Sequence, residues 1–295
     1  MVTRTFKGDS WLYNLTNKKD LLWLTIWIAG LGVLWIWDAL FLNAPAFARL
    51  QTAFLNSLLT GLMVVLFSLA LGWFLGVSLN TLEHSKSKVG FAILSFVTDI
   101  LRSIPQIIAV LIGYVVLTIL LHNGIIRSSF VQMVWIAGTI AIAVFLEVAD
   151  TIRQRIDYFR TLDFVDAMLC CGIKERRIMN VEILWKNSRS HMLHKLIAIF
   201  GISIFLQCSI DFIISVGLST DVSLINFPMT LGNLLANVDS KQDILALSNL
   251  FTEPGYVSVI FTRHLQGLSV AFCIVFSMLC IYMIANGFVR RHKLA

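Results

Sequence analysis

Residues 53–80, AFLNSLLTGLMVVLFSLALGWFLGVSLN, form a run of 28 positions without a charged side chain. A helix needs roughly 20 apolar residues to cross the hydrocarbon core of a bilayer, so this run predicts a transmembrane helix. The run also holds Gly61, Gly72 and Gly76. Small residues let neighbouring helices approach closely inside a membrane, where tight packing drives their association.

The rest of the chain has a similar composition. Of its 295 residues, 58% are hydrophobic and 14% are charged, whereas soluble domains carry about 25% charged residues. This composition excludes a soluble enzyme with a large aqueous domain, and the abundance of apolar residues excludes a disordered chain. Five further apolar runs are long enough to span a bilayer: 21–42, 90–121, 130–149, 196–217 and 265–289. We therefore expect an all-α membrane protein with six transmembrane helices.

Lysine and arginine are distributed unevenly among the segments that flank these runs. Eighteen of the 23 basic residues lie before the first run, between runs two and three, between runs four and five, or after the sixth. The alternate connections hold Arg49, Arg127, Lys241 and Arg263. Because cytoplasmic loops carry the Lys and Arg excess, this distribution predicts that both termini are cytoplasmic. The net charge of +6 is therefore attributed to membrane orientation and not to nucleic-acid binding.

The first run, 21–42, is longer than the roughly 7–15 residues of a cleaved signal core, so we expect it to be retained. In the outer loop, 229–237 is expected to form a short helix or a re-entrant turn. The expected parts are a cytoplasmic segment at 1–20, the first helix at 21–42, a five-span core at 53–289 with a cytoplasmic loop at 150–195 and an outer loop at 218–264, and a cytoplasmic tail at 290–295.

The third run, 90–121, is interrupted by Asp99, Arg102 and Pro105. Proline removes a backbone donor and disfavours helical geometry at the preceding residue, so we expect a kink near 103–105. The part before the kink is expected to lie near the cytoplasmic face and the part after it to cross the membrane. Asp99 and Arg102 are three residues apart and opposite in charge, which fits either an ion pair or a gate beside the kink.

The cytoplasmic loop contains two predicted helices. Apolar residues recur over 164–171 at spacings of three and four, which is typical of an amphipathic helix, and Gly172 stands where such a helix ends. Charged and apolar residues are interleaved over 173–184 and predict a second short helix. The two helices are expected to form a docking surface.

This loop resembles the EAA loop of ATP-binding-cassette importer permeases, which reads Glu-Ala-Ala, three residues, Gly, nine residues, Ile-x-Leu-Pro. The spacing is kept, but Asp replaces the Glu, Met the second Ala, Glu the Ile and Trp the Pro. The matching positions are Asp166, Ala167, Met168, Gly172, Glu182, Leu184 and Trp185.

Other segments resemble the dipeptide, oligopeptide and nickel branch of that family, specifically its C-type permease. Arg153 stands where this branch has an arginine at the end of the preceding helix, and Asp99 and Pro105 match its Asp-Ile-Leu-x-x-Phe-Pro segment. The branch also carries a long outer segment ending in Gly-Thr-Asp and Gly-Arg-Asp between its first two spans, which this chain lacks. A third matching segment comprises Gly217, Pro228 and 229–236, MTLGNLLA.

The resemblance implies a type I importer permease fold in the bacterial inner membrane and transport of peptides or a similar small solute. It implies four kinds of partner: a second, homologous permease forming a heterodimer, two ATPase subunits, an extracytoplasmic solute-binding protein, and the lipid bilayer. The chain has no Gly-x-x-x-x-Gly-Lys-Ser/Thr phosphate-binding loop, so ATP and Mg²⁺ are expected on the partner ATPases. We expect no catalytic residue and no metal site; His191 and His194 are expected at the membrane interface.

Two groups of site residues follow from the resemblance. Span five faces the central cavity in such permeases, and intramembrane ionisable residues are functional candidates, so Asp211 and the neighbouring Gln207 are expected to line the translocation pathway. The helix around 164–172 is expected to sit in a groove of the ATPase, with basic residues pairing at its rim or serving only the positive-inside rule. The residues expected to couple the permease to the ATPase are Arg153, Phe164, Asp166, Ala167, Gly172, Lys174 and Arg177.

Three other functions remain open at this point. The same architecture fits an exporter, and the altered EAA element fits a non-transporting or degenerate subunit. A secondary transporter is a third possibility. It needs intramembrane ion ligands and usually repeated halves, and the sequence displays neither.

Overall fold

The computed structural model describes residues 19–83, 88–217, 227–263 and 265–293, in which all regular structure is helical. Most of the expected segment 1–20, part of the outer loop 218–264 and the end of the tail 290–295 lie outside the described residues. The helices that are individually long and apolar enough to cross a membrane are α2 (Lys19–Phe41), α3 (Ala44–Glu83), α6 (Ser129–Arg160), α9 (Arg189–Gly217) and α14 (Leu265–Lys293).

A sixth span forms if α4 (Lys88–Ser103) and α5 (Gln106–His122) are counted together. These two helices are separated by Ile104 and Pro105 and are bent by 90° relative to each other. The described part of the chain is thus an all-helical protein with five or six apolar helices of membrane-spanning length.

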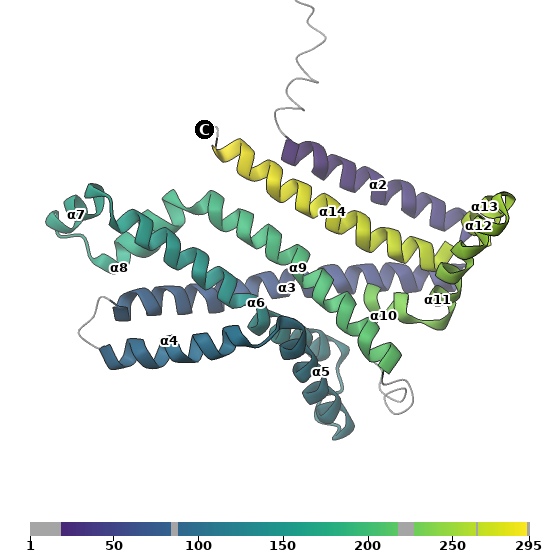
Figure 1. Ribbon diagram of the computed structural model, residues 1–295, viewed down its shortest axis with the longest axis horizontal. Coiled ribbons are helices and arrows are strands. Elements are labelled where there is room, and N and C mark those ends of the chain that lie inside the picture. Colours follow the sequence, from purple (N-terminus) through teal and green to yellow (C-terminus); the bar gives the residue numbers. More distant parts are fainter. Residues whose placement is uncertain (1–18, 84–87, 218–226, 264, 294–295) are drawn as a thin grey trace, which may run out of the picture.

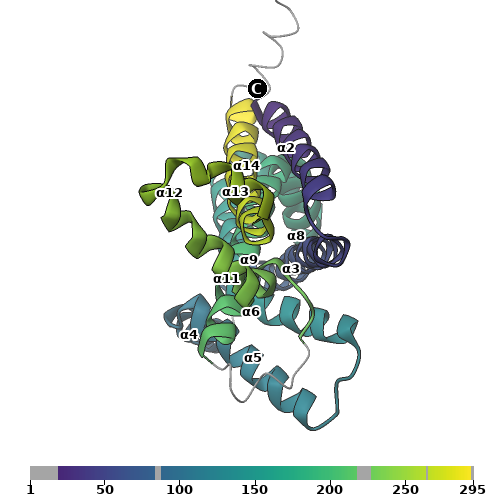
Figure 2. The same ribbon diagram turned by 90° about the vertical axis from the view of Figure 1, so that its right-hand side faces the viewer.

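The helices are arranged around α3, α6 and α9 (Figure 1). α3 packs most extensively against α6, while α2 packs against α14. α5 lies on the opposite side of this centre from α2 and α14 (Figure 2). The short helices α7 (Asp163–Cys170) and α8 (Glu175–Arg177) lie at one end of the bundle, and α11 (Val238–Leu245), α12 (Asn249–Thr252) and α13 (Val257–Arg263) lie at the other (Figure 1).

The glycines of α3 lie where other helices approach it. A Cβ atom on Gly72 would lie 2.5 Å from Val148 Cβ, and one on Gly76 would lie 2.9 Å from Ile152 Cγ2, both on α6. A Cβ atom on Gly61 would lie 2.9 Å from Phe200 of α9. Close packing at these three positions, expected from the sequence, therefore serves two different neighbours of α3.

Replacing Gly72 by leucine is expected to lower the thermal unfolding midpoint of the detergent-purified protein. The new side chain would collide with Val148 and with the backbone oxygen of Phe145, and overpacking of this kind typically costs about 1–3 kcal/mol. Gly32→Leu on α2 is the matched control, because a Cβ at Gly32 meets nothing within 4 Å. Equal midpoints for the two variants would contradict the packing described here.

Two helix boundaries differ from those expected. The connection expected at 43–52 is mostly helical, since α3 begins at Ala44, and Pro45 in its first turn suits a helix start. α6 runs to Arg160 and so extends into the expected cytoplasmic loop. The polar residues of this extension find partners on neighbouring helices, which lets the helix continue beyond its apolar run.

The helix expected over 173–184 is also divided. α8 covers only Glu175–Arg177, and Ile178–Asn187 form a π-helical segment, η1. Ile178, Met179, Ile183 and Leu184 are all buried in the core cluster of α6 and α9. Wider helical turns place these four side chains on the core side of a short segment, an arrangement that the interleaved charged and apolar residues did not indicate.

Candidate functional site

The first candidate site is the α7–α8 element, residues 163–177, which stands at one end of the bundle (Figure 1). Gly172 ends α7 with a φ of +78°, a backbone conformation that favours glycine. The N–H of Gly172 donates to Leu169 O at 2.9 Å, and the N–H of Ile173 donates to Met168 O at 3.2 Å. These two bonds form a Schellman motif, so α7 ends where the sequence predicted.

α7 has one face turned to the bundle and one face turned away from it. On the inner face, Val165 is buried, and the ring of Phe164 meets Phe159 of α6 edge-on, with centroids 5.8 Å apart. Phe164 therefore anchors α7 to its own chain. Asp166 and Ala167 are exposed, as are Asp163, Leu169 and Cys170.

The base of this element is tied to two long helices. Arg160 at the end of α6 forms an ion pair with Glu175 of α8. Trp73 Nε1 on α3 donates to Asn180 Oδ1 at 2.8 Å, and Asn180 Nδ2 donates to Arg176 O at 3.0 Å. These contacts connect the α7–α8 element to α3 and α6. The sequence reasoning missed these residues because their partners are distant in the chain.

The basic residues predicted for coupling lie in different places. Lys174 and Arg177 are exposed on the α7–α8 element. Arg153 instead forms an ion pair with Glu83 of α3 at 2.7 Å, and its guanidinium lies 5.7 Å from the ring centroid of Phe91 on α4. Arg153 thus joins three helices of its own chain and is not part of the exposed face of α7.

Of the two interpretations of Asp99 and Arg102, an ion pair or a gate, the ion pair between them is not among those of the described residues. Arg102 pairs with Asp150 of α6 at 2.7 Å, while Asp99 is exposed on α4. The end of α4 lies beside α6, so a carboxylate on the neighbouring helix replaces the one on the same helix. Pro105 lies between α4 and α5 at the 90° bend.

The start of α5 is held by a second polar contact to α6. Gln106 Nε2 donates to Glu147 Oε1 at 3.0 Å, and Lys195 Nζ of α9 pairs with Glu147 Oε2 at 2.6 Å. Glu147 therefore links the first residue after the bend to α9. With the Arg102–Asp150 pair, α6 contacts the chain on both sides of the bend.

The second candidate site is the buried carboxylate of Asp211 on α9, which is 7% exposed. Tyr114 on α5 donates its hydroxyl to Asp211 Oδ1 at 2.9 Å. Thr230 donates its hydroxyl to Asp211 Oδ2 and accepts from the N–H of Asn233 at 3.2 Å, so it also caps α10 (Leu231–Ala236). α5, α9 and α10 therefore meet at one carboxylate.

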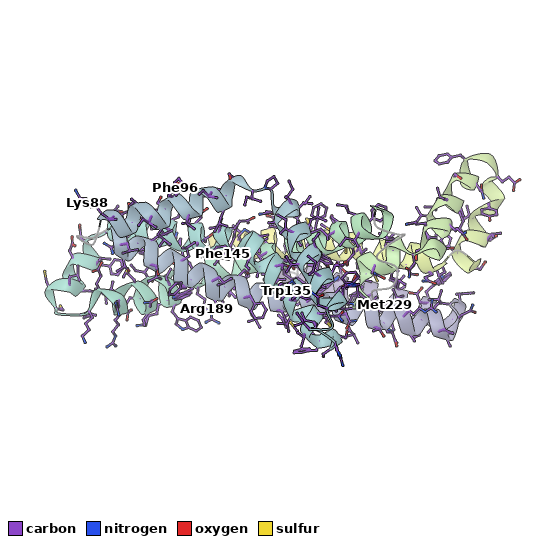
Figure 3. All side chains as sticks on the ribbon, turned by 90° about the horizontal axis from the view of Figure 1, so that it is seen from below. Lys88, Phe96, Trp135, Phe145, Arg189 and Met229 are labelled. Carbon is purple, nitrogen blue, oxygen red and sulfur yellow. The ribbon has the colours of Figure 1, made fainter. Side chains whose placement is uncertain are left out.

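The segment before α10 is also bound to α3. Asn56 Nδ2 donates to Met229 O at 2.8 Å, and the N–H of Leu231 donates to Ser57 Oγ at 2.9 Å. Figure 3 labels Met229, which lies in the non-helical segment just before α10. The structure thus has a short helix in the stretch expected at 229–237, held by side chains of α3 and α9.

α10 lies very close to α9. A Cβ on Gly232 would lie 2.6 Å from Cys208 Cα and 2.9 Å from Asp211 Cβ. Gln207, one turn before Asp211, is 1% exposed, and its amide has no hydrogen-bond partner among the described residues. Asp211 and Gln207 are both buried inside this chain, and their part in a translocation pathway stays a prediction. The sequence did not identify Tyr114 and Thr230 as site residues. The one indication was Asp211 itself, because a carboxylate in an apolar run needs hydrogen-bond donors.

Neither candidate site resembles a metal centre. Within the described ranges, no three or more His, Cys, Asp or Glu side chains come together. His194 Nδ1 donates to the backbone oxygen of Ala285 at 3.1 Å, because a carbonyl can only accept. His194 therefore contacts α14.

No protein-family model and no curated protein sequence matches this chain at a significant level. Its function is therefore inferred from its residues and their geometry.

Proposed function

We propose that this chain is a permease subunit of an ATP-driven importer in the bacterial inner membrane. It would form the pathway for a peptide or a similar small solute with a second permease, and would receive its solute from an extracytoplasmic binding protein. The observation that carries this proposal is the α7–α8 element, whose inner face is fixed to the bundle while its outer face is free.

An importer of this kind needs an element through which nucleotide binding on one protein moves the helices of another. Energetic coupling between two sites requires an element with two arrangements that both sites bias. α7 is joined to α6 by only Thr161 and Leu162, and its base is tied to α3 through Asn180 and Trp73. A displacement of α7 would therefore be transmitted directly to α6 and α3.

The outer face of α7 also indicates the chemistry of the partner surface. Asp163 and Asp166 lie in the first turn, and Leu169, 44% exposed, follows them in the last. Two exposed basic residues follow Gly172: Lys174 immediately precedes α8, and Arg177 is its last residue. The complementary groove on an ATPase would offer an apolar floor with basic groups near the start of α7 and acidic groups near α8.

The bend between α4 and α5 is the part of the structure on which a displacement of α7 would act. α6 contacts α4 through Asp150 and Arg102 and contacts α5 through Glu147 and Gln106. α7 follows the C-terminal end of the same helix, beyond both of these contacts. We propose that displacement of α6 changes the angle at this bend.

The test is purification of the detergent-solubilised chain together with its bound proteins. We expect an ATPase carrying a Gly-x-x-x-x-Gly-Lys-Ser/Thr loop, identified by mass spectrometry, to co-purify with it. Ala167→Arg should abolish this association without changing the thermal midpoint, since Ala167 is exposed. Gln242→Arg on α11, exposed at the other end of the bundle, is the matched control and should retain the ATPase.

A secondary transporter is the competing candidate, and the buried, ionisable Asp211 is the observation that favours it. Uptake by the reconstituted protein separates the two. Uptake that requires ATP and the co-purified subunits supports the importer, whereas uptake by the lone chain driven by an ion gradient would overturn it. Solute movement in the opposite direction would identify an exporter.

A further inference from the structure

Three buried polar side chains at the centre of the bundle, where α3, α6 and α9 meet, have atoms without a hydrogen-bond partner among the described residues (Figure 1). They are the hydroxyl of Thr60 on α3, Oε1 of Gln132 on α6, and both amide atoms of Gln207 on α9. Thr60 and Gln207 are 1% exposed, and Gln132 is 6% exposed. Because buried polar atoms in native proteins almost always have a partner, these atoms point to a bound water or ion.

Gln207 lies opposite the turn 57–61 of α3, which holds Thr60. On one side of Gln207 the contact is direct. The hydroxyl of Ser203, one turn before Gln207, lies 3.2 Å from the position that a Cβ on Gly61 would take. The face of α9 that carries Ser203 and Gln207 is therefore turned toward this part of α3.

On the other side of Gln207 the contact runs through α10. Asp211 Cβ, one turn after Gln207, lies 2.9 Å from the position that a Cβ on Gly232 would take. The preceding residue, Leu231, donates its N–H to Ser57 Oγ at 2.9 Å. Contacts with the same turn of α3 thus lie on both sides of Gln207, which places its side chain opposite this turn.

Gln132 of α6 lies at the same level. The two glycine contacts of α3 with α6 described above follow the same chain direction, so the two helices are parallel, and Gly72 packs against Val148. Gln132 and Val148 belong to one buried stripe of α6 with a residue at every fourth position, so both are turned toward α3. The same register, continued to the start of α6, brings Gln132 opposite Asn56, one turn from Thr60.

Asp211 adds a negative charge that has no cationic partner among the described residues. Its hydrogen bonds come from the neutral hydroxyls of Tyr114 and Thr230, and the ion pairs of the described residues do not include it. Burying a charge costs free energy unless an opposite charge compensates it. Asp211 is one turn from Gln207 on α9, so a cation held by the neighbouring oxygen atoms would compensate this carboxylate.

We infer that the centre of the bundle binds a monovalent metal cation such as Na⁺. Its ligands are the side-chain oxygens of Thr60, Gln132, Gln207 and Asp211. Oxygen ligands suit hard cations, and a single carboxylate balances a single positive charge. Three of the four ligands are neutral, so this site differs in kind from the clusters of His, Cys, Asp and Glu that hold transition metals. The inference concerns cation binding and not transport, so it holds or fails independently of the proposed importer.

The test is thermal unfolding of the detergent-purified full-length chain, with any co-purifying subunits, in a buffer free of metal cations. Replacing N-methylglucamine chloride by the same concentration of NaCl or KCl should raise the unfolding midpoint by about 3 °C or more. The reason is that a ligand that binds only the folded state stabilises that state. Equal chloride concentrations keep the ionic strength constant, so the comparison isolates the cation.

Thr60→Val and Gln207→Leu should each remove this cation effect. In the cation-free buffer both variants should unfold at or above the wild-type midpoint, because each removes a buried polar group that has no partner among the described residues. Ser68→Ala is the matched control on α3. The hydroxyl of Ser68 is buried but donates to Val65 O at 3.2 Å, so its removal should leave the cation effect in place.

Asp211→Asn should also lose the cation effect, because it removes the compensating charge. Equal midpoints in all three chloride solutions would overturn the inference and leave water as the partner of these side chains. A cation effect that survives both Thr60→Val and Gln207→Leu would overturn it as well, and if one of these variants fails to fold, the other decides. So would a wild-type midpoint that rises on acidification but not with NaCl or KCl, since Asp211 would then bind a proton.

Discussion

Replacing Asp211 by alanine is expected to lower the thermal midpoint of the detergent-purified protein by at least several degrees. The change leaves the hydroxyls of Tyr114 and Thr230 without their acceptor in a buried site. Leaving a buried polar group unsatisfied costs about 1–3 kcal/mol, and here two groups are affected. The same change releases the start of α10 from α9.

The measurement is thermal unfolding of the purified variants under identical detergent conditions. Asp211→Asn should have a smaller effect, because its amide oxygen still accepts from Tyr114 and its amide group can donate to Thr230. Ile213→Ala, an exposed position on the same helix, is the control for truncating a side chain of α9. A wild-type midpoint for Asp211→Ala would show that this carboxylate does not hold α5, α9 and α10 together.

The same variants separate a structural role of Asp211 from a role in transport. If Asp211 only holds α10, Asp211→Asn should retain uptake in the reconstituted complex. If Asp211 also lines the pathway, Asp211→Asn should lose uptake while its thermal midpoint stays near that of the wild type.

Replacing Gly172 by valine is expected to reduce transport-coupled ATP hydrolysis at least tenfold while changing the thermal midpoint little. The φ of +78° at this position is strained for a β-branched residue, at a cost of roughly 1–2 kcal/mol, and that strain would change how α7 ends. The side chain itself meets nothing within 4 Å, and α7 lies outside the central bundle. Because the altered backbone is confined to the end of α7, the strain should be relieved there, so coupling should be impaired while the thermal midpoint of the central bundle changes little.

Solute-stimulated ATPase activity of the reconstituted complex is the measurement, and this prediction rests on the proposed function. Gly172→Asn is the matched variant and should retain most activity, because asparagine tolerates the left-handed backbone conformation. Gly138→Val tests for a general effect of adding a side chain, since its Cβ also meets nothing within 4 Å. Full coupling in Gly172→Val would separate the end of α7 from energy transfer.

The long apolar helices were predictable because each rests on a local property of the chain. An apolar run of about 20 residues is long enough to cross the hydrocarbon core of a bilayer, and this property belongs to the run itself. α7 and its end at Gly172 were predictable for a similar reason, since amphipathic spacing and a glycine act within a single helical turn.

The helix boundaries near the α7 end were not predictable from local pattern. Arg153 and Asp150 are charged, and charge in sequence suggests a loop outside the membrane. In the structure, Glu83 and Arg102 on neighbouring helices pair with them, which lets α6 continue to Arg160. The interpretation of Asp99 and Arg102 as an ion pair was wrong, because the partner of Arg102 depends on how α4 lies against α6.

The chain's amino-acid order was enough to predict an all-helical protein with helices long and apolar enough to span a membrane, and a short helix that ends at Gly172, because these depend on composition and on contacts within a few residues. The burial of Asp211 between Tyr114 and Thr230 and the attachment of Arg153 to Glu83 required the three-dimensional structure. Each of these joins residues far apart in the chain, and the polar partner that makes a buried charge tolerable is known only when the helices are packed.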